Sequence, residues 1–125
     1  MDDERSSKIE IGGEQYELVL TTRATKEIAA RYGGLDKLGD KLFSAENFEA
    51  AISEVVWLVT ILANQGIMIH NLKNHDKKPL LTEEMVELLT CPSDLAGFNA
   101  AITDALQKGA KRNVIGEEPK NMIAE

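Results

Sequence analysis

The chain has 125 residues and a formal net charge of −7; 43% of its residues are hydrophobic and 28% are charged. We expect a single domain, residues 1–125, long enough to bury a core without metals or disulfides. The negative charge argues against wrapping a nucleic acid, because phosphate binding requires a concentrated basic surface. The single cysteine, Cys91, excludes an internal disulfide.

The first regular pattern predicts a β-hairpin over about residues 8–21. Apolar and polar residues alternate on both sides of a Gly-Gly pair, which is typical of two strands joined by a tight turn. A glycine-rich phosphate loop is disfavoured, because no Lys-Ser/Thr follows and no helix begins at the turn. We expect the apolar side to lie on a helical core, with Glu10 and Glu17 facing water. Residues 1–7 are expected to be a flexible tail without the features of a signal peptide.

A short helix is predicted over Arg23–Tyr32. Thr21 or Thr22 can cap its start, and Gly33 supplies the left-handed residue that commonly ends a helix. Its inner stripe consists of Ala24, Ile28 and Tyr32. Leucine spacing then predicts a further short helix before a serine cap; the residues are Leu35, Leu38, Leu42 and Ser44.

The central helix, over about residues 45–65, is the most apolar part of the chain. Its middle carries no charge, and a helix that is apolar most of the way round must be covered on most sides. We therefore expect a mainly α, compact helical domain built around it. We do not expect a membrane span, because polar residues interrupt the apolar run. The two faces carry Phe48, Ile52, Val55, Val59 and Leu62, and Trp57, Leu58 and Ile61; Trp57 is expected in the core.

The second half of the chain is predicted to hold two more helices. Asn64-Gln65-Gly66 either ends the central helix or bends it, and residues 74–79 form a polar loop. Thr82 caps a helix that ends near Thr90 and has Met85, Leu88 and Leu89 inside. After Pro92, a final helix runs to about Gly109, and residues 113–125 form a flexible tail. Its inner stripe consists of Leu95, Phe98, Ala101, Ile102, Ala105 and Leu106.

The sequence offers no residue set suited to catalysis, a cofactor or a metal. His70 and His75 are five positions apart, which places them on different helix faces. Cys91 matches no catalytic signature and is expected to be a small buried residue. Two clusters of acidic residues are expected to lie on the solvated surface. One consists of Glu83, Glu84 and Glu87, and the other of Glu117 and Glu118. We therefore predict that the chain is not an enzyme and has no cofactor.

One cluster of basic residues stands out in the sequence; it lies near the end of the final helix, where its members offset the negative dipole. They are Lys108, Lys111 and Arg112. The two helices around Pro92 could mimic a helix-turn-helix. However, the second helix carries Asp94 and Asn99 near its start and no Arg there, whereas recognition helices need donors for phosphates and bases.

One pattern runs through the opening third of the chain: Ile9-x-Ile11-Gly12-Gly13-x-x-Tyr16-x-Leu18-x-Leu20-Thr21-Thr22-Arg23, then a short helix to Tyr32-Gly33, then Leu35-x-x-Leu38. This pattern resembles small tail assembly chaperones of long-tailed bacteriophages and prophages. The later part is also similar, with an apolar central helix, a final helix and an acidic tail containing Glu117-Glu118-Pro119-Lys120-Asn121. The resemblance covers most of the chain and is best marked from Ile9 to Leu38.

The resemblance implies a mostly helical, non-enzymatic protein that binds the tape-measure protein before the tail tube forms. Such proteins keep the apolar helices of the tape-measure protein soluble and help recruit tail tube protein subunits. They act in the cytoplasm of the bacterial host and are absent from the mature virion. In many such phages, a frameshift near the end of the reading frame makes a longer form. The resemblance transfers no binding residues to this chain.

The residues themselves suggest where a partner could bind. Helix-in-groove binding needs exposed apolar surface, and the apolar content after Gly66 exceeds what one helix face requires. Methionine adapts well at promiscuous surfaces. We predict a partner-binding or homo-oligomer surface at Ile67, Met68, Ile69 and Leu72. Two alternatives stay open: a structural tail or head-completion protein of the same phage, and a small helical nucleic-acid-binding regulator.

Overall fold

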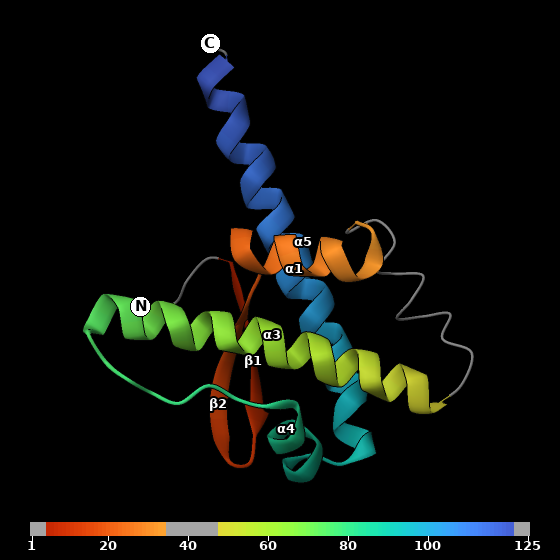
Figure 1. The fold of residues 1–125 in the computed structure, drawn as a ribbon. Coiled ribbons are helices and arrows are strands. Elements are labelled where there is room, and N and C mark those ends of the chain that lie inside the picture. Colours follow the sequence, from red (N-terminus) through yellow and green to blue (C-terminus); the bar gives the residue numbers. More distant parts are fainter. Residues whose placement is uncertain (1–4, 35–47, 122–125) are drawn as a thin grey trace.

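The computed structural model describes residues 5–34 and 48–121, with side chains up to residue 110. The described elements are mainly helical, with an N-terminal antiparallel hairpin and one long apolar helix, which confirms the predicted fold class. In chain order (Figure 1) they are β1 (Ser6–Ile11), β2 (Glu14–Val19), α1 (Thr22–Tyr32), α3 (Phe48–Asn74), α4 (Glu83–Leu89) and α5 (Pro92–Asn121). The short helix predicted from Leu35, Leu38 and Leu42 lies outside the described residues, as does Ser44, the predicted cap of the central helix.

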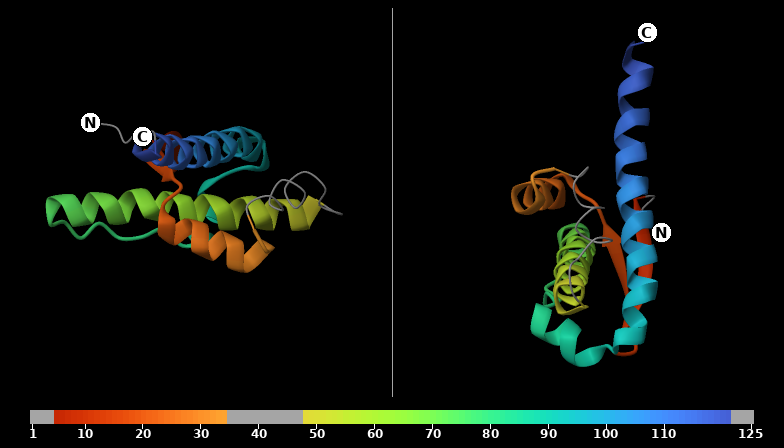
Figure 2. Two further views of the ribbon diagram at one scale, coloured as in Figure 1. Left: turned by 90° about the horizontal axis from the view of Figure 1, so that it is seen from above. Right: turned by 90° about the vertical axis from the view of Figure 1, so that its right-hand side faces the viewer.

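The described elements form two crossed layers (Figure 2). Helices α1 and α3 lie on one side, and the hairpin runs beside α5 on the other. Strand β2 packs mainly on α3, and strand β1 packs on α5. Helix α4 connects the two layers near the turn of the hairpin. The hairpin, which would be marginal alone in water, is therefore supported by both long helices.

The hairpin begins earlier than predicted, because the serines before it are bound to α5. Ser6 and Ser7 are buried and belong to β1, so they are not part of a flexible tail. The Ser7 hydroxyl donates to the Ala101 carbonyl oxygen over 2.8 Å, and the Lys108 ammonium donates to the Ser6 carbonyl oxygen over 2.9 Å. These bonds satisfy polar groups that burial would otherwise leave without partners.

The turn and the two faces of the hairpin largely follow the alternating pattern. Gly12 and Gly13 have positive φ angles of 60° and 85°, which glycine adopts without steric cost. Glu10 faces water as predicted. Glu17 is instead partly buried, and Val19 on the same face is fully buried. The prediction for Glu17 was wrong because β2 also rests against α3.

Helix α1 has the predicted boundaries and inner stripe. The Thr21 hydroxyl is the N-cap and accepts from the Ala24 amide over 3.0 Å. At the other end, Gly33 is left-handed with φ 88°, and its amide donates to the Ala29 carbonyl oxygen. Ala24, Ile28 and Tyr32 are all buried.

Helix α3 runs to Asn74, well beyond the predicted end near residue 65. Gly66 does not end the helix, because it is a contact point: a Cβ atom there would lie 2.5 Å from the Glu17 carbonyl oxygen of β2. The missing side chain lets α3 rest directly on the strand. Phe48, predicted to lie in the core, is 70% exposed at the start of the helix.

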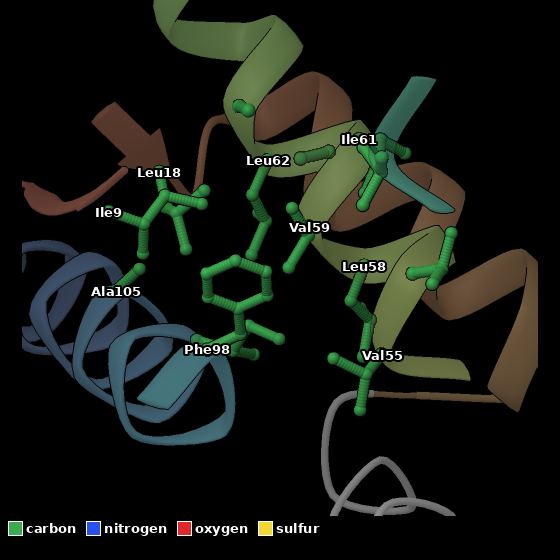
Figure 3. Packing of buried hydrophobic residues seen from close by; sticks show 14 of the residues in the cluster. Ile9, Leu18, Val55, Leu58, Val59, Ile61, Leu62, Phe98 and Ala105 are labelled. Atoms are coloured by element: carbon green, nitrogen blue, oxygen red, sulfur yellow. The ribbon is translucent and has the colours of Figure 1, made fainter. Parts of the chain in front are cut away.

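The core is centred on the middle of α3 (Figure 3). Leu58, Val59 and Leu62 are fully buried, and the ring of Phe98 from α5 lies among Leu62, Ile9 and other apolar side chains. By length and composition α3 could cross a bilayer, and 39% of its most apolar window is buried within the fold. In the structure this apolar middle forms the contact between the layers.

After α3 the chain returns along the helix as an extended segment, residues 76–81, which we call the strap. Asn71 bonds the backbone of Lys78 in both directions, at 3.0 and 3.1 Å. Asn64 does the same to the backbone of Leu81, at 2.7 and 2.9 Å. Seven helical residues rise about 10 Å, which matches three extended residues. The two asparagines therefore hold the strap in register, and its last residue, Leu81, is buried.

Helix α4 has the predicted bounds but is more exposed than predicted. Its cap is Thr82, as expected, with the hydroxyl accepting from the Met85 amide over 3.1 Å. The predicted inner residues Met85, Leu88 and Leu89 are all exposed, whereas Val86 is fully buried. The prediction of the buried face was wrong because α4 lies at the periphery and reaches the core through Val86.

Helix α5 also continues past its predicted end, from Pro92 to Asn121, so it includes part of the segment expected to be a tail. Gly109 is buried inside the helix, and a Cβ atom there would come within 2.8 Å of the Leu20 side chain. It permits a close approach of α5 to the hairpin and does not terminate the helix. The predicted inner stripe is confirmed: Phe98, Ile102 and Ala105 are buried, and Leu95, Ala101 and Leu106 pack against them.

Candidate partner-binding surface

Large exposed apolar side chains mark the surfaces where another molecule could bind. Such residues are common singly, but grouped they indicate interaction sites. Among the described residues they gather at two places, the end of α3 and the region of α4. They are Leu72 on α3, Leu80 in the strap, and Met85, Leu88 and Leu89 on α4; Phe48 is a further exposed residue and lies apart from these, at the start of α3.

The four residues predicted to bind a partner divide into two sets. Ile67 packs against the core cluster, so it supports the fold. Met68 and Ile69 are partly buried, and Leu72 is 79% exposed. Met68 and Leu72 are four positions apart and so share one side of α3. The structure thus brings Met68 and Leu72 to a common face of α3.

The last turns of α3 project past the hairpin, with the strap returning beneath them (Figure 1). On the side facing α1, the Arg23 guanidinium lies 3.5 Å from the Met68 sulfur. The helix ends at Asn74 and is followed by His75, whose φ is 52°, and the Asp76 amide donates to the Asn71 carbonyl oxygen over 3.1 Å. This left-handed end turns the chain back into the strap.

A polar pair fixes the same turn. His70 Nε2 lies 3.0 Å from an Asp76 carboxylate oxygen, and the Lys77 amide donates to the other oxygen over 2.8 Å. The hydrogen bond from His70 and then the one from the Lys77 amide lower the pKa of Asp76. His70 and His75 are not brought together, and we found no group of three or more potential metal ligands among the described residues.

A second polar cluster joins α1 to the first half of α3. The Arg31 guanidinium carbon lies 4.4 Å from the centre of the Trp57 ring, and its Nε is 3.3 Å from a Glu54 carboxylate oxygen. The Tyr32 hydroxyl donates to the same carboxylate. Burial, followed by the bond to Glu54, raises the pKa of Tyr32. Trp57 packs edge-on against Tyr32 at 6.0 Å, so this cluster accounts for it as a packing residue.

Cys91 is exposed, which corrects the expectation that it is buried. It precedes the first residue of α5, and its backbone amide donates to the Asp94 carboxylate over 2.8 Å. The residue therefore belongs to a capping arrangement, in which a carboxylate in the first turn binds the amide before the helix. Its position at a helix start, and not in the core, is the reason that it is solvated.

A hollow of about 500 Å³ lies where the start of α1 meets α5. Its polar lining consists of Arg5, Lys26 and three threonines, and it contains no carboxylate, imidazole or thiol. The lining residues are Arg5, Leu20, Thr21, Thr22, Thr25, Lys26, Ala29 and Gly109. This part of the molecule therefore adds no argument for catalysis.

The predicted basic cluster is partly used by the fold. Lys108 lies 3.0 Å from the Asp104 carboxylate and donates to the hairpin backbone. The side chains of Lys111 and Arg112 lie outside the described residues.

Comparison with known proteins gives no match: no family model, no curated protein and no solved structure is similar to this chain.

Proposed function

We propose that the chain is a tail assembly chaperone of a phage or prophage. In this role it binds the tape-measure protein, keeps that protein soluble and helps recruit tail tube subunits. Two features support the proposal. One is the resemblance of residues 9–38 to such chaperones, and the other is the exposed apolar side of α3 at its projecting end.

The observation that carries most weight is the position of Leu72. This side chain is 79% exposed, one helical turn from the partly buried Met68, on a helix that extends beyond the hairpin. The apolar side of a rigid helix end can bind a client helix, and because the helix end is already ordered, the chaperone loses little conformational entropy on binding. Burying one leucine contributes about 1.5–3 kcal/mol.

The overall charge supports the second requirement of a chaperone, which is to keep an apolar client dispersed. A net charge of −7 gives the complex like-charged surfaces that repel one another in solution. The proposal implies that the protein acts in the host cytoplasm and is absent from purified virions.

The test is co-expression of the full chain with the tape-measure protein of the same phage, followed by measurement of soluble tape-measure protein. We expect the wild-type chain to keep the client soluble and to co-purify with it. The double variant Met68→Glu/Leu72→Glu should lose both effects, because charged side chains would be buried in an apolar contact. Ala30→Glu, which introduces one glutamate at an exposed position of α1, should behave as the wild type.

Circular dichroism of each variant shows whether it is folded. A folded double variant that solubilises the client as well as the wild type does would reject the α3 surface. A wild-type chain without any effect on the solubility of the client would reject the chaperone function itself.

A further inference from the structure

The exposed side of α4 combines apolar residues with acidic surroundings. Leu88 is 75% exposed, Leu89 50% and Met85 38%. These residues are three and four positions apart, which places them on one side of the helix. A seven-residue helix that buries only Val86 and exposes three large apolar side chains has its apolar surface turned outward.

The turn of the hairpin extends this surface. Leu89 lies against Gly12: a methyl group added at Gly12 would come within 3.3 Å of the Leu89 Cδ1 atom. The apolar side of α4 therefore continues onto the tip of the hairpin, and two segments distant in sequence form one face. We call Met85, Leu88, Leu89 and Gly12 the α4 face.

The charges on the two segments that form the α4 face are all of one sign. From Glu83 to Asp94 there are four carboxylates and no basic residue. From Ile9 to Val19 there are three carboxylates and again no basic residue. Glu83, Glu84 and Glu87 are exposed. The potential over the apolar side chains is therefore strongly negative, and it selects what can approach them.

We propose that the α4 face binds an amphipathic helix whose apolar side is flanked by Lys or Arg. The apolar side of such a helix would cover Leu88 and Met85, and its cations would lie opposite the glutamates. A second copy of this chain fits poorly, because two α4 faces would bring like charges together. An anionic membrane surface is disfavoured for the same reason. This proposal does not depend on the chaperone function, since it follows from the charges and exposure around α4.

The test uses the full chain and a synthetic amphipathic peptide about five turns long, with leucines on one side and lysines beside them. Binding is measured by fluorescence anisotropy at low and moderate salt. One control peptide has the same composition in an order that spreads the leucines around the helix. Another has glutamate in place of lysine. We expect the patterned basic peptide alone to bind, and to bind less tightly as salt rises.

Two variants locate the site. Leu88→Ser should weaken binding about tenfold, because it removes the most exposed apolar contact. Glu14→Gln/Glu84→Gln removes the charge at the tip of the hairpin and the one that lies a turn before Leu88 on the same side of α4; it should weaken binding severalfold at low salt and less at high salt. The matched control Glu27→Gln/Glu49→Gln changes the net charge equally at exposed positions on α1 and α3, and it should leave binding almost unchanged.

Several results would overturn the proposal. Equal binding of the scrambled basic peptide, or an equal effect of the two glutamine variants, would indicate unspecific attraction to a negative protein. Binding that is insensitive to Leu88→Ser would remove the apolar contact from the site. A concentration-dependent increase in mass that Leu88→Ser abolishes would instead assign the α4 face to a second copy of the chain.

Discussion

Replacing Gly66 by alanine tests whether α3 rests directly on the hairpin. The added Cβ atom would lie 2.5 Å from the Glu17 carbonyl oxygen and 3.4 Å from its carbonyl carbon. Separations below 3.0 Å are essentially absent for real Cβ atoms, so helix and strand must move apart. The obstructing atom belongs to the backbone of a paired strand, which cannot rotate out of the way as a side chain could.

The magnitude follows from two opposing effects. Overpacking a tight contact costs about 1–3 kcal/mol, whereas alanine favours a helix interior by about 1 kcal/mol relative to glycine. Gly97 in α5 provides the control, because nothing lies within 4 Å of a Cβ atom there. Gly97→Ala should therefore gain the helical preference alone. The difference between the two variants isolates the overpacking cost of about 1–3 kcal/mol.

The assay is urea unfolding followed by far-UV circular dichroism and by Trp57 fluorescence. We expect Gly66→Ala to unfold at a lower urea concentration than the wild type and Gly97→Ala at an equal or higher one, with unchanged slopes. If Gly66→Ala is as stable as Gly97→Ala, α3 does not touch β2 in the way described, and the explanation for the length of α3 is wrong.

Four further predictions concern side-chain bonds and partners. Tyr32→Phe should lower the free energy of unfolding at neutral pH by about 1 kcal/mol. Because folding raises the pKa of Tyr32 well above its ordinary value of 10.0, the stability from its bond to Glu54 is complete below about pH 10 and declines as the pH rises from there towards the folded pKa; the stability difference between the two proteins in urea should be constant up to about pH 10 and shrink above it. Asn64→Ala should destabilise the chain by about 1–3 kcal/mol, since two backbone bonds in a partly buried setting are lost, and Asn71→Ala at the exposed end should have a clearly smaller effect; equal effects would contradict the description of the strap. Because folding lowers the pKa of Asp76 below 3.8, its contribution is present above that pH and disappears as the pH falls further, so Asp76→Asn should differ from the wild type in limited proteolysis of the strap at pH 6 and not in strong acid. Finally, a DNA mobility-shift assay should show no salt-dependent shift, whereas such a shift would favour the nucleic-acid-binding alternative.

Local signals in the sequence were sufficient for most of the fold. The Gly-Gly turn, the threonine caps of α1 and α4, and the inner stripes of α1 and α5 are encoded within a few residues of the elements that they define. The apolar middle of α3 likewise predicted a helix that other elements cover on most sides. These features depend on periodicity and capping, which act over one or two turns.

The glycines show where local reasoning fails. Gly33 ends a helix with a left-handed residue, as predicted. Gly66 and Gly109 look similar in the sequence, yet both lie inside helices, where a residue of β2 packs against Gly66 and the residue just after β2 packs against Gly109. The partner atoms belong to Glu17 and Leu20, far away along the chain. No local pattern can report such a contact, and so both helices were predicted too short.

The candidate surfaces were predicted only in part. Leu72 is exposed on the expected segment, but Ile67 beside it belongs to the core. On α4, Leu88 was predicted to lie in the interior, because the sequence pattern of an apolar stripe does not differ between a helix that faces the core and one that faces a partner. A seven-residue helix contains too few residues to separate the two orientations, and only the burial of Val86 decides between them.

The most direct test of the central claim is photo-crosslinking of the full chain in the presence of the tape-measure protein. A photoreactive residue is placed at position 72, at the end of α3, or at position 30, on the exposed side of α1. The account predicts a covalent adduct with the tape-measure protein from position 72 and none from position 30. Adducts from position 30 alone, or from neither position while the two proteins still co-purify, would contradict it.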